Sequence, residues 1–258
     1  MERLFYHMES ISTLIIGGTA AYRLDLAPWR PVGAPFILRT PYGDSPPITL
    51  LQPEDAHPPV AFCSRHGHDA LKRSAAFLNH RAIIWGAKML GAETIFSWNG
   101  VGAIDERLQV GDLVVPVDLI DFTRTRVTTF GHPDLRPASG PAFHPDARSA
   151  ILASLSNPNP VSNPIYVCTE GPRLETEAEI ALYHQAGAHI VGMTLSPEAF
   201  LAQEAGIRYA SLGYVTNYAT GRALGRPPRR EFGPVVARTC LPILLRAAAT
   251  LVSAMPLP

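Results

Sequence analysis

The chain has 258 residues, of which 47% are hydrophobic and 17% are charged, so it can bury one large core without needing a second domain. Lys plus Arg and Asp plus Glu number 22 each, and this balance provides no net field to attract nucleic acid or an anionic membrane. We therefore predict a single domain over residues 1–258 that binds a small neutral or locally anionic molecule, with no nucleic acid and no membrane among its partners.

In chain order, apolar runs and turn residues predict strands that alternate with helices. The predicted strands cover residues 12–16, 60–63, 94–97, 113–120, 165–169, 190–191 and 209–215. The predicted helices cover residues 75–90, 175–186 and 197–205, with a long helix at the C-terminus. Prolines crowd residues 27–60, which predicts short edge strands, and residues 131–145 are predicted to form a surface loop. The alternation predicts an α/β fold with a largely parallel mixed sheet flanked by helices on both faces.

The cysteines lie far apart, without a C-x-x-C pair or a Cys/His spacing typical of a metal site. They are Cys63, Cys168 and Cys240. This pattern predicts buried thiols in a reducing cytoplasm and no metal site. The first residues are too charged for a signal peptide. Pro242 and Arg246 interrupt the apolar run over residues 241–257, which favours a core helix over a membrane span.

Four polar segments follow predicted strands, at the place where ligands of open α/β sheets bind. In the first, the glycine turn that ends in Thr19 offers backbone N–H groups and a hydroxyl to a phosphate, although a plain strand-ending turn is the more frequent use of such glycines. In the second, Arg65 and His66 offer a forked cation and a further donor to an anion, with a surface pair as the alternative.

The third segment, residues 98–102, ends a predicted strand with small residues that expose backbone amides, and Trp98 is expected to pack in the core. The fourth combines residues 170–176 with residues 191–194. Glu175 and Glu179 are four residues apart, so on a continuous helix they share a face, where like charges repel unless one is solvated and the other has a partner. Together the four segments predict one polar pocket.

The order and spacing of these segments resemble a known enzyme family. They are G-G-T at residues 17–19, R-H-G-H at 65–68, N-G-V-G at 99–102, E-G-P-R-L-E-T-E-A-E at 170–179, V-G-M-T-x-x-P-E-A at 191–199 and V-T-N at 215–217. This set resembles the purine nucleoside phosphorylase superfamily, and most of all its methylthioadenosine and methylthioinosine phosphorylase branch, over nearly the whole chain. The resemblance implies the nucleoside phosphorylase fold and a pentosyltransferase of purine salvage that uses inorganic phosphate as co-substrate and no other cofactor.

By this resemblance, one group of residues binds phosphate and another binds the nucleoside. The phosphate group comprises Thr19, Arg65, His66, Gly100 and Thr194. The nucleoside group comprises Asn99, Met193 beneath the ribose, and Glu175 and Asn217, the two candidate catalytic residues at the base. Relatives with Asn at this last position act on 6-oxopurines, so the resemblance implies methylthioinosine, inosine or guanosine as substrate. The alternative for Asn217 is a structural cap at the end of its strand.

Three departures from the family pattern keep other functions open. Ala20 stands where relatives carry glycine, the loop over residues 69–74 differs, and residues 123–144 form a shorter segment without the stretch that covers the 5' side of the sugar from a neighbouring subunit. The alternatives are a methylthioadenosine phosphorylase, an enzyme for another nucleoside-like substrate, and a non-catalytic purine-binding or structural protein that has kept the fold. The resembling branch also implies a homotrimer.

Overall fold

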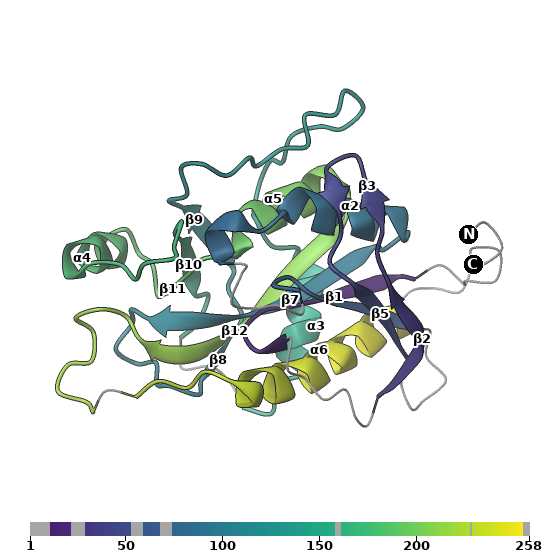
Figure 1. Cartoon of the computed structure of the whole chain (residues 1–258). Coiled ribbons are helices and arrows are strands. Elements are labelled where there is room, and N and C mark those ends of the chain that lie inside the picture. Colours follow the sequence, from purple (N-terminus) through teal and green to yellow (C-terminus); the bar gives the residue numbers. More distant parts are fainter. Residues whose placement is uncertain are drawn as a thin grey trace.

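A ten-stranded mixed sheet lies at the centre of the computed structural model, which describes residues 11–21, 29–52, 59–67, 74–157, 161–227 and 229–254 (Figure 1). Its main path runs through β2 (Arg30–Phe36), β5 (Ile48–Gln52), β6 (Val60–Ser64), β1 (Thr13–Gly17), β7 (Thr94–Ala103), β11 (Ile190–Gly192), β10 (Ile165–Cys168) and β9 (Asp118–Asp121). Two further strands leave this path, because β12 (Arg208–Tyr218) pairs with β7 and β8 (Leu113–Val114) pairs with β12. A separate hairpin joins β3 (Arg39–Thr40) to β4 (Gly43–Asp44).

Two sets of parallel strands make up most of this sheet. In the first set, β1 runs parallel to β6 and β7, and β12 runs parallel to β7. In the second set, β10 runs parallel to β11 and β9. The two sets are antiparallel to each other where β11 meets β7, and β2, β5 and β8 add further antiparallel pairs. The predicted largely parallel mixed sheet is confirmed.

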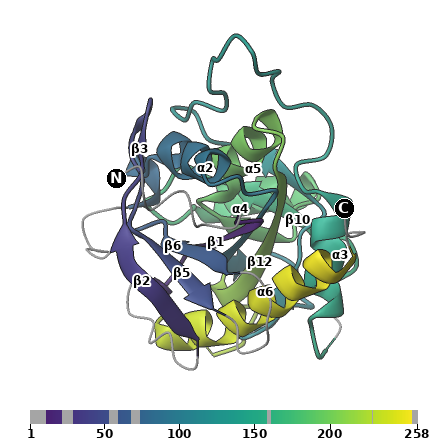
Figure 2. The same ribbon diagram turned by 90° about the vertical axis from the view of Figure 1, so that its right-hand side faces the viewer.

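Helices cover both faces of the sheet, as predicted (Figures 1 and 2). The helices are α2 (His80–Met89), α3 (Pro145–Ala153), α4 (Glu177–Gln185), α5 (Leu195–Glu204) and α6 (Pro234–Ala254), with a short 3-10 turn at Ala75–Phe77. Alternate residues of β1 point to opposite faces: Leu14 and Ile16 pack in the cluster that includes α2 and α5, whereas Ile15 packs in the cluster of α3 and α6. A strand buried on both sides needs a continuous apolar run, which explains its sequence.

Three predicted elements show the largest differences from the structure in their bounds. The predicted strand over residues 113–120 is two short strands, β8 and β9, because Pro116 between them has no N–H to give to a ladder. The predicted strand over residues 94–97 continues through residue 103 as β7. The predicted helix over residues 75–90 begins only at His80, because Asn79 caps it by accepting a hydrogen bond from Ala82 N at 3.1 Å.

The C-terminal helix α6 belongs to the core. Within the described part of the chain, it is the one helix long and apolar enough to cross a membrane, and 56% of its most apolar stretch is buried inside the fold. Cys240 on this helix is buried, as are Cys63 and Cys168, and all three are free thiols, as predicted. Burial raises the pKa of Cys63 and of Cys168 to about 12, so both stay protonated at neutral pH. Trp98 is fully buried, as predicted.

Candidate active site

A cavity of about 300 Å³ lies over the middle of β7, where β1 and β11 end from opposite directions. Ile16 of β1 pairs with Ser97, and Val191 of β11 pairs with Gly102, so the two strand ends face each other across residues 98–101. The nine residues singled out from the sequence all line this cavity: Thr19, Arg65, His66, Asn99, Gly100, Glu175, Met193, Thr194 and Asn217. They converge from two opposed sets of strands rather than along one edge of a parallel sheet, which the sequence did not predict.

The turn after β1 brings its backbone close to the cavity wall. A Cβ atom on Gly18 would lie 2.2 Å from the backbone oxygen of Trp98, so this approach requires glycine. Ala20, the departure from the family pattern, has φ 63° and takes the left-handed conformation itself. Thr19 therefore reaches the cavity, where its Oγ1 accepts a hydrogen bond from Gly100 N at 3.3 Å. The altered loop over residues 69–74 lies, except for its last residue, outside the described residues.

Arg65 holds a carboxylate rather than presenting its full fork to the cavity. It is 1% exposed, and its Nε and Nη2 each donate to Glu198 over 2.8 Å. Burial by itself lowers the pKa of Arg65, but attraction to Glu198 outweighs burial and raises the pKa, so the guanidinium stays charged. Nη1 donates to Trp98 O at 2.8 Å. Only the remaining N–H groups of Arg65 are left for a ligand, which corrects the expectation of a fork aimed at an anion.

Glu198 on α5 also binds groups from two other elements. His80 Nδ1 on α2 lies 3.2 Å from Oε1, and Tyr209 OH on β12 donates to Oε2 at 2.7 Å. Burial by itself raises the pKa of Glu198, but Arg65 and the hydrogen bonds from His80 and Arg65 lower it overall, so Glu198 is ionised. Burial lowers the pKa of His80, which keeps the imidazole neutral at pH 7.

The connection between β11 and α5 carries Met193 and Thr194. Thr194 occupies the N-cap position of α5, yet its hydroxyl makes no capping bond and is buried without a partner in the described part of the protein. A hydroxyl donor on a cavity wall suits an anion. Arg126 fixes this connection, because its Nη1 donates to the carbonyl oxygens of Met193 and Ser196 over 2.5 and 2.6 Å and its Nη2 donates to Glu170 O over 2.8 Å.

Glu175 lies just before α4 and not on it. Thr176 caps the helix, and Glu179 completes the capping box and pairs with Arg173 at 2.7 Å. The prediction that Glu175 and Glu179 share a helix face is therefore wrong, because the cap starts the helix at residue 177. Glu175 is instead 7% exposed and lines the cavity, and its Oε1 accepts from Thr169 Oγ1 at 2.6 Å. No donor among the described residues contacts its Oε2.

Asn217 enters the cavity through an irregularity in β12. The pairing register with β7 shifts between Val215 and Asn217, and such a bulge re-aims the side chain that follows it. Asn217 Oδ1 accepts from Thr216 Oγ1, and its Nδ2 donates to Tyr218 O, both at 2.9 Å. The strand-end contacts that the sequence left open as an alternative are thus present, but one Nδ2 proton and one Oδ1 lone pair remain for a ligand.

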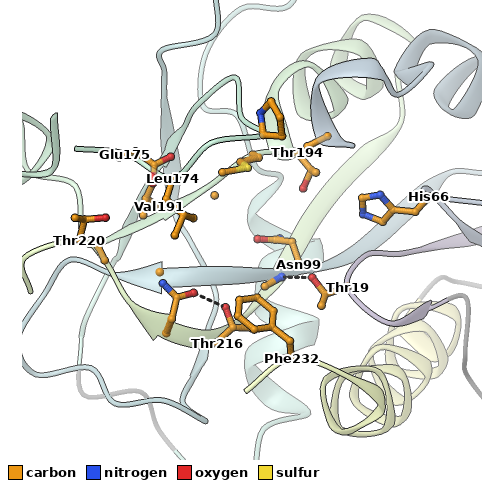
Figure 3. A pocket seen from close by; sticks show the side chains of 18 of the residues that line it. Thr19, His66, Asn99, Leu174, Glu175, Val191, Thr194, Thr216, Thr220 and Phe232 are labelled. Atoms are coloured by element: carbon orange, nitrogen blue, oxygen red, sulfur yellow. Dashed lines mark hydrogen bonds between the residues drawn. The ribbon is translucent and has the colours of Figure 1, made fainter. Parts of the chain in front are cut away.

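Figure 3 shows how these side chains divide the cavity into two ends. His66, Thr19 and Thr194 lie toward one end, whereas Glu175 and Thr220 lie toward the other. Asn217 belongs to the second end, because it lies next to Val191, which Figure 3 shows near Glu175. Both side chains flank Gly102: a Cβ atom added to this glycine would lie 3.3 Å from Asn217 Nδ2 and 3.0 Å from Val191. The first end is rich in hydrogen-bond donors, and the second combines a carboxylate with an amide. No group of three or more His, Cys, Asp or Glu side chains in the described ranges is placed to hold a metal ion.

Three residues that support the site were missed in the sequence. Glu198 stands inside the V-G-M-T-x-x-P-E-A motif, so its fixed spacing was the available signal. Thr216 lines the cavity beside Asn217 and stands inside V-T-N. Arg126 lies in a segment without any motif, and only the three-dimensional structure reveals its contacts with the β11–α5 connection.

Comparisons with known proteins identify the family. A family model described as the Phosphorylase superfamily matches residues 17–247. The chain is 40% identical over 207 residues to a probable S-methyl-5'-thioinosine phosphorylase of Methanothermobacter thermautotrophicus, covering 80% of this chain and 71% of the relative. It is 36% identical over 220 residues to the 6-oxopurine nucleoside phosphorylase of Pyrococcus furiosus, covering 80% of this chain and 79% of the relative.

Solved structures show the same fold. A methylthioadenosine phosphorylase from an antarctic soil metagenomic library superposes with a TM-score of 0.79 at 30% identity, covering 96% of this chain and 88% of that one. Methylthioadenosine phosphorylase from Schistosoma mansoni in complex with adenine superposes with a TM-score of 0.80 at 26% identity, covering 95% and 93%. The chain belongs to the phosphorylase superfamily. It is an enzyme of the pentosyltransferase class, to which the nucleoside phosphorylases among its relatives belong.

Proposed function

We propose that this enzyme cleaves the N-glycosidic bond of a 6-oxopurine nucleoside with inorganic phosphate, the substrate being methylthioinosine, inosine or guanosine. The observation that carries the proposal is the two-ended cavity, with hydroxyl and cationic donors at one end and Glu175 and Asn217 at the other (Figure 3). One cavity with an anion-binding end and a ring-binding end fits a phosphate and a nucleoside bound together. The names of the relatives in Methanothermobacter and Pyrococcus support this substrate class.

The first end supplies donors to phosphate. Thr19 and Thr194 contribute hydroxyls, and His66 and the remaining N–H groups of Arg65 contribute further donors. Because the charge of Arg65 is balanced by Glu198, we infer that hydrogen bonds, rather than a bare cation, provide most of the phosphate affinity.

The reaction joins a phosphate oxygen to the anomeric carbon and breaks the bond from that carbon to N9 of the base. In the transition state the sugar carries positive charge, which the phosphate oxygens held by Thr19 and Thr194 stabilise. The base leaves with the electron pair of the broken bond and carries negative charge. The second Nδ2 proton of Asn217 donates to N7 of the leaving base, and water then supplies the proton that makes the free base neutral.

The carboxylate of Glu175 favours 6-oxopurines. A 6-oxopurine carries a proton on N1, which the Oε2 oxygen of Glu175 accepts, whereas N1 of a 6-aminopurine has no proton to give. Leaving a buried acceptor without a donor costs about 1 to 3 kcal/mol, which is enough to select between the two bases. A methylthioadenosine phosphorylase is the second candidate, since the solved structures that match the fold carry that name.

We also infer that the enzyme works as a cytoplasmic homotrimer. The rim of the cavity carries Leu174 and Phe232, which are 50% and 58% exposed, and apolar side chains at the mouth of a site suit a neighbouring subunit. Residues 123–144 lack the stretch that covers the sugar in relatives, so a neighbouring copy would have to close the cavity with other side chains.

The proposal is tested with a panel of nucleosides and the purified protein. Methylthioinosine, inosine, guanosine, methylthioadenosine and adenosine are each incubated with and without phosphate, and the free base is separated and quantified. We expect phosphate-dependent release of hypoxanthine or guanine at higher efficiency than adenine. Glu175→Gln should reduce this preference, with Glu177→Gln on the exposed surface of α4 as the matched control. Preferred release of adenine would establish the second candidate, and no release of any base would refute phosphorolysis.

A further inference from the structure

A chain of buried hydrogen bonds runs from Glu198 to the wall of the cavity. Tyr209 OH donates to Glu198 Oε2 at 2.7 Å and lies 2.8 Å from Ser97 Oγ. Ser97 Oγ lies 2.8 Å from Ser211 Oγ, and Asn99 Nδ2 donates to Ser211 Oγ at 2.9 Å. All five side chains are buried. The chain therefore links an ionised carboxylate between α5 and the sheet to an amide that lines the cavity.

The pairing of β7 with β12 builds this chain. Ser97 lies directly opposite Ser211 in the parallel register of the two strands. Asn99 is two residues after Ser97, and Tyr209 is two residues before Ser211, so all four side chains point to the same face of the sheet. That face is covered by α5, which carries Glu198.

The number of protons determines which way the Asn99 amide points. Four hydrogen bonds link the five side chains, and each of them needs one proton. The three hydroxyl groups, on Tyr209, Ser97 and Ser211, supply one proton each. The carboxylate of Glu198 can only accept, so the fourth proton must come from the NH₂ group of Asn99. If the amide were flipped, two oxygen atoms 2.7 to 2.9 Å apart would have no proton between them. The hydroxyl of Ser211 can also donate to the backbone oxygen of Ser97, but this distance is longer, at 3.3 Å.

This orientation turns Asn99 Oδ1 away from the chain. Oδ1 is buried and has no hydrogen-bond partner in the described part of the protein, and Asn99 lines the cavity between Thr19 and Thr194 (Figure 3). A carbonyl oxygen only accepts hydrogen bonds, so it repels an unprotonated phosphate oxygen and attracts an O–H group. A buried acceptor without a partner is costly, which favours a ligand that supplies that proton.

We propose that Asn99 Oδ1 accepts a hydrogen bond from a hydroxyl of the bound ligand, and that Glu198 is a positioning residue that holds Asn99 in this orientation through Tyr209, Ser97 and Ser211. The inference rests on the proposed function, because that function supplies ligands with hydroxyls. The hydroxyl belongs either to hydrogen phosphate or to the sugar. Hydrogen phosphate carries one proton on its oxygens at neutral pH and sulfate carries none, so the first source makes the site select phosphate over sulfate.

The test measures the binding of phosphate and of sulfate to the whole protein by calorimetry, each in the absence of nucleoside. If the hydroxyl is that of hydrogen phosphate, we expect wild type to prefer phosphate by roughly tenfold, the worth of one hydrogen bond made rather than lost. Tyr209→Phe separates Asn99 from Glu198 and lets the amide turn its NH₂ toward the anion. The preference should then fall severalfold, chiefly because sulfate binds better. A role confined to packing would weaken both anions equally.

Two further variants sharpen the test. Ser211→Ala breaks the chain at a smaller side chain and should have the same effect if Tyr209→Phe does not fold. Tyr214→Phe is the matched control, because Tyr214 is also buried on β12 but belongs neither to this series of hydrogen bonds nor to the cavity lining. This variant should leave the preference for phosphate over sulfate unchanged.

The sugar is tested as the other source of the hydroxyl. If Asn99 reads the sugar, the variants leave the phosphate-to-sulfate ratio unchanged and instead reduce the discrimination between inosine and its 2'- or 3'-deoxy analogues, measured as binding affinity. Either change supports the inference. The inference is overturned if wild type binds phosphate and inosine but Tyr209→Phe and Ser211→Ala change neither the phosphate-to-sulfate ratio nor the discrimination against deoxy analogues. That outcome leaves the proposed function intact. Wild type that binds neither ligand overturns both.

Discussion

Replacing Asn217 with Asp should shift the enzyme from 6-oxopurines toward 6-aminopurines. The amide now donates to Tyr218 O and accepts from Thr216 Oγ1, both at 2.9 Å, which leaves one N–H to the base. A carboxylate in the same place keeps the contact with Thr216 but has no proton for Tyr218 O or for N7 of the base. It can instead accept from the exocyclic amino group of adenine.

The magnitude follows from the groups left unpaired. One mispaired buried polar contact costs about 1 to 3 kcal/mol, so the ratio of the two catalytic efficiencies should change by at least about tenfold, which corresponds to about 1.4 kcal/mol. The lost donor to Tyr218 O also lowers the free energy of unfolding, by about 1 kcal/mol if the carboxyl group remains ionised.

The assay compares kcat/KM for methylthioinosine and methylthioadenosine on wild type and on Asn217→Asp, with thermal unfolding measured in parallel. Asn157→Asp is the matched control, because Asn157 is exposed and lies outside the cavity, and the same change of charge there should leave the ratio unaltered. If both activities of Asn217→Asp are measurable and their ratio equals that of wild type, Asn217 does not read the base.

Three further outcomes are expected. Arg126→Ala leaves the carbonyl oxygens of Met193, Ser196 and Glu170 without their donor. The free energy of unfolding, measured with urea, should therefore fall by about 3 kcal/mol or more. An unchanged midpoint of the urea transition would show that water replaces the guanidinium. Burial lowers the pKa of His80 from its ordinary 6.5, so the unfolded state binds the proton first and stability decreases as pH falls below about 6.5. His80→Asn should therefore reduce the loss of melting temperature between pH 7 and pH 5, and an identical loss in both proteins would contradict the shift. Light scattering at micromolar concentration should give the mass of a trimer, and a monomer would oppose the inferred assembly.

Patterns along the sequence predicted most of the strands and helices, because each buried strand is a short apolar run closed by glycine or proline. The errors arose where a single residue decides a boundary. Pro116 divides one predicted strand in two, and the cap at Thr176 places Glu175 outside the helix to which its spacing assigned it. Such boundaries depend on side-chain hydrogen bonds that hydrophobic periodicity does not report.

The residues of the cavity wall could be predicted from motifs, but their partners could not. Arg65 was expected to face an anion, and nothing near it in the sequence indicated that Glu198, 133 residues later, occupies its fork. The reversal of direction between β11 and β7 was equally hidden, since strand order and direction depend on long-range pairing. Motifs reveal which groups meet at a site, whereas tertiary contacts determine which of their atoms remain available.

The meeting of two opposed strand sets over β7 has a consequence for the response of the protein to its ligands. One set carries Thr19 and Arg65, and the other carries Thr194, so a phosphate bound as proposed would contact both sets across the line where the sheet changes direction. These contacts form only in the folded protein, so saturating phosphate should raise the free energy of unfolding, by about 2.7 kcal/mol at one hundred times its dissociation constant. Hydrogen exchange should then slow in β11 and β1 together, although the two strands are distant in sequence and do not pair directly.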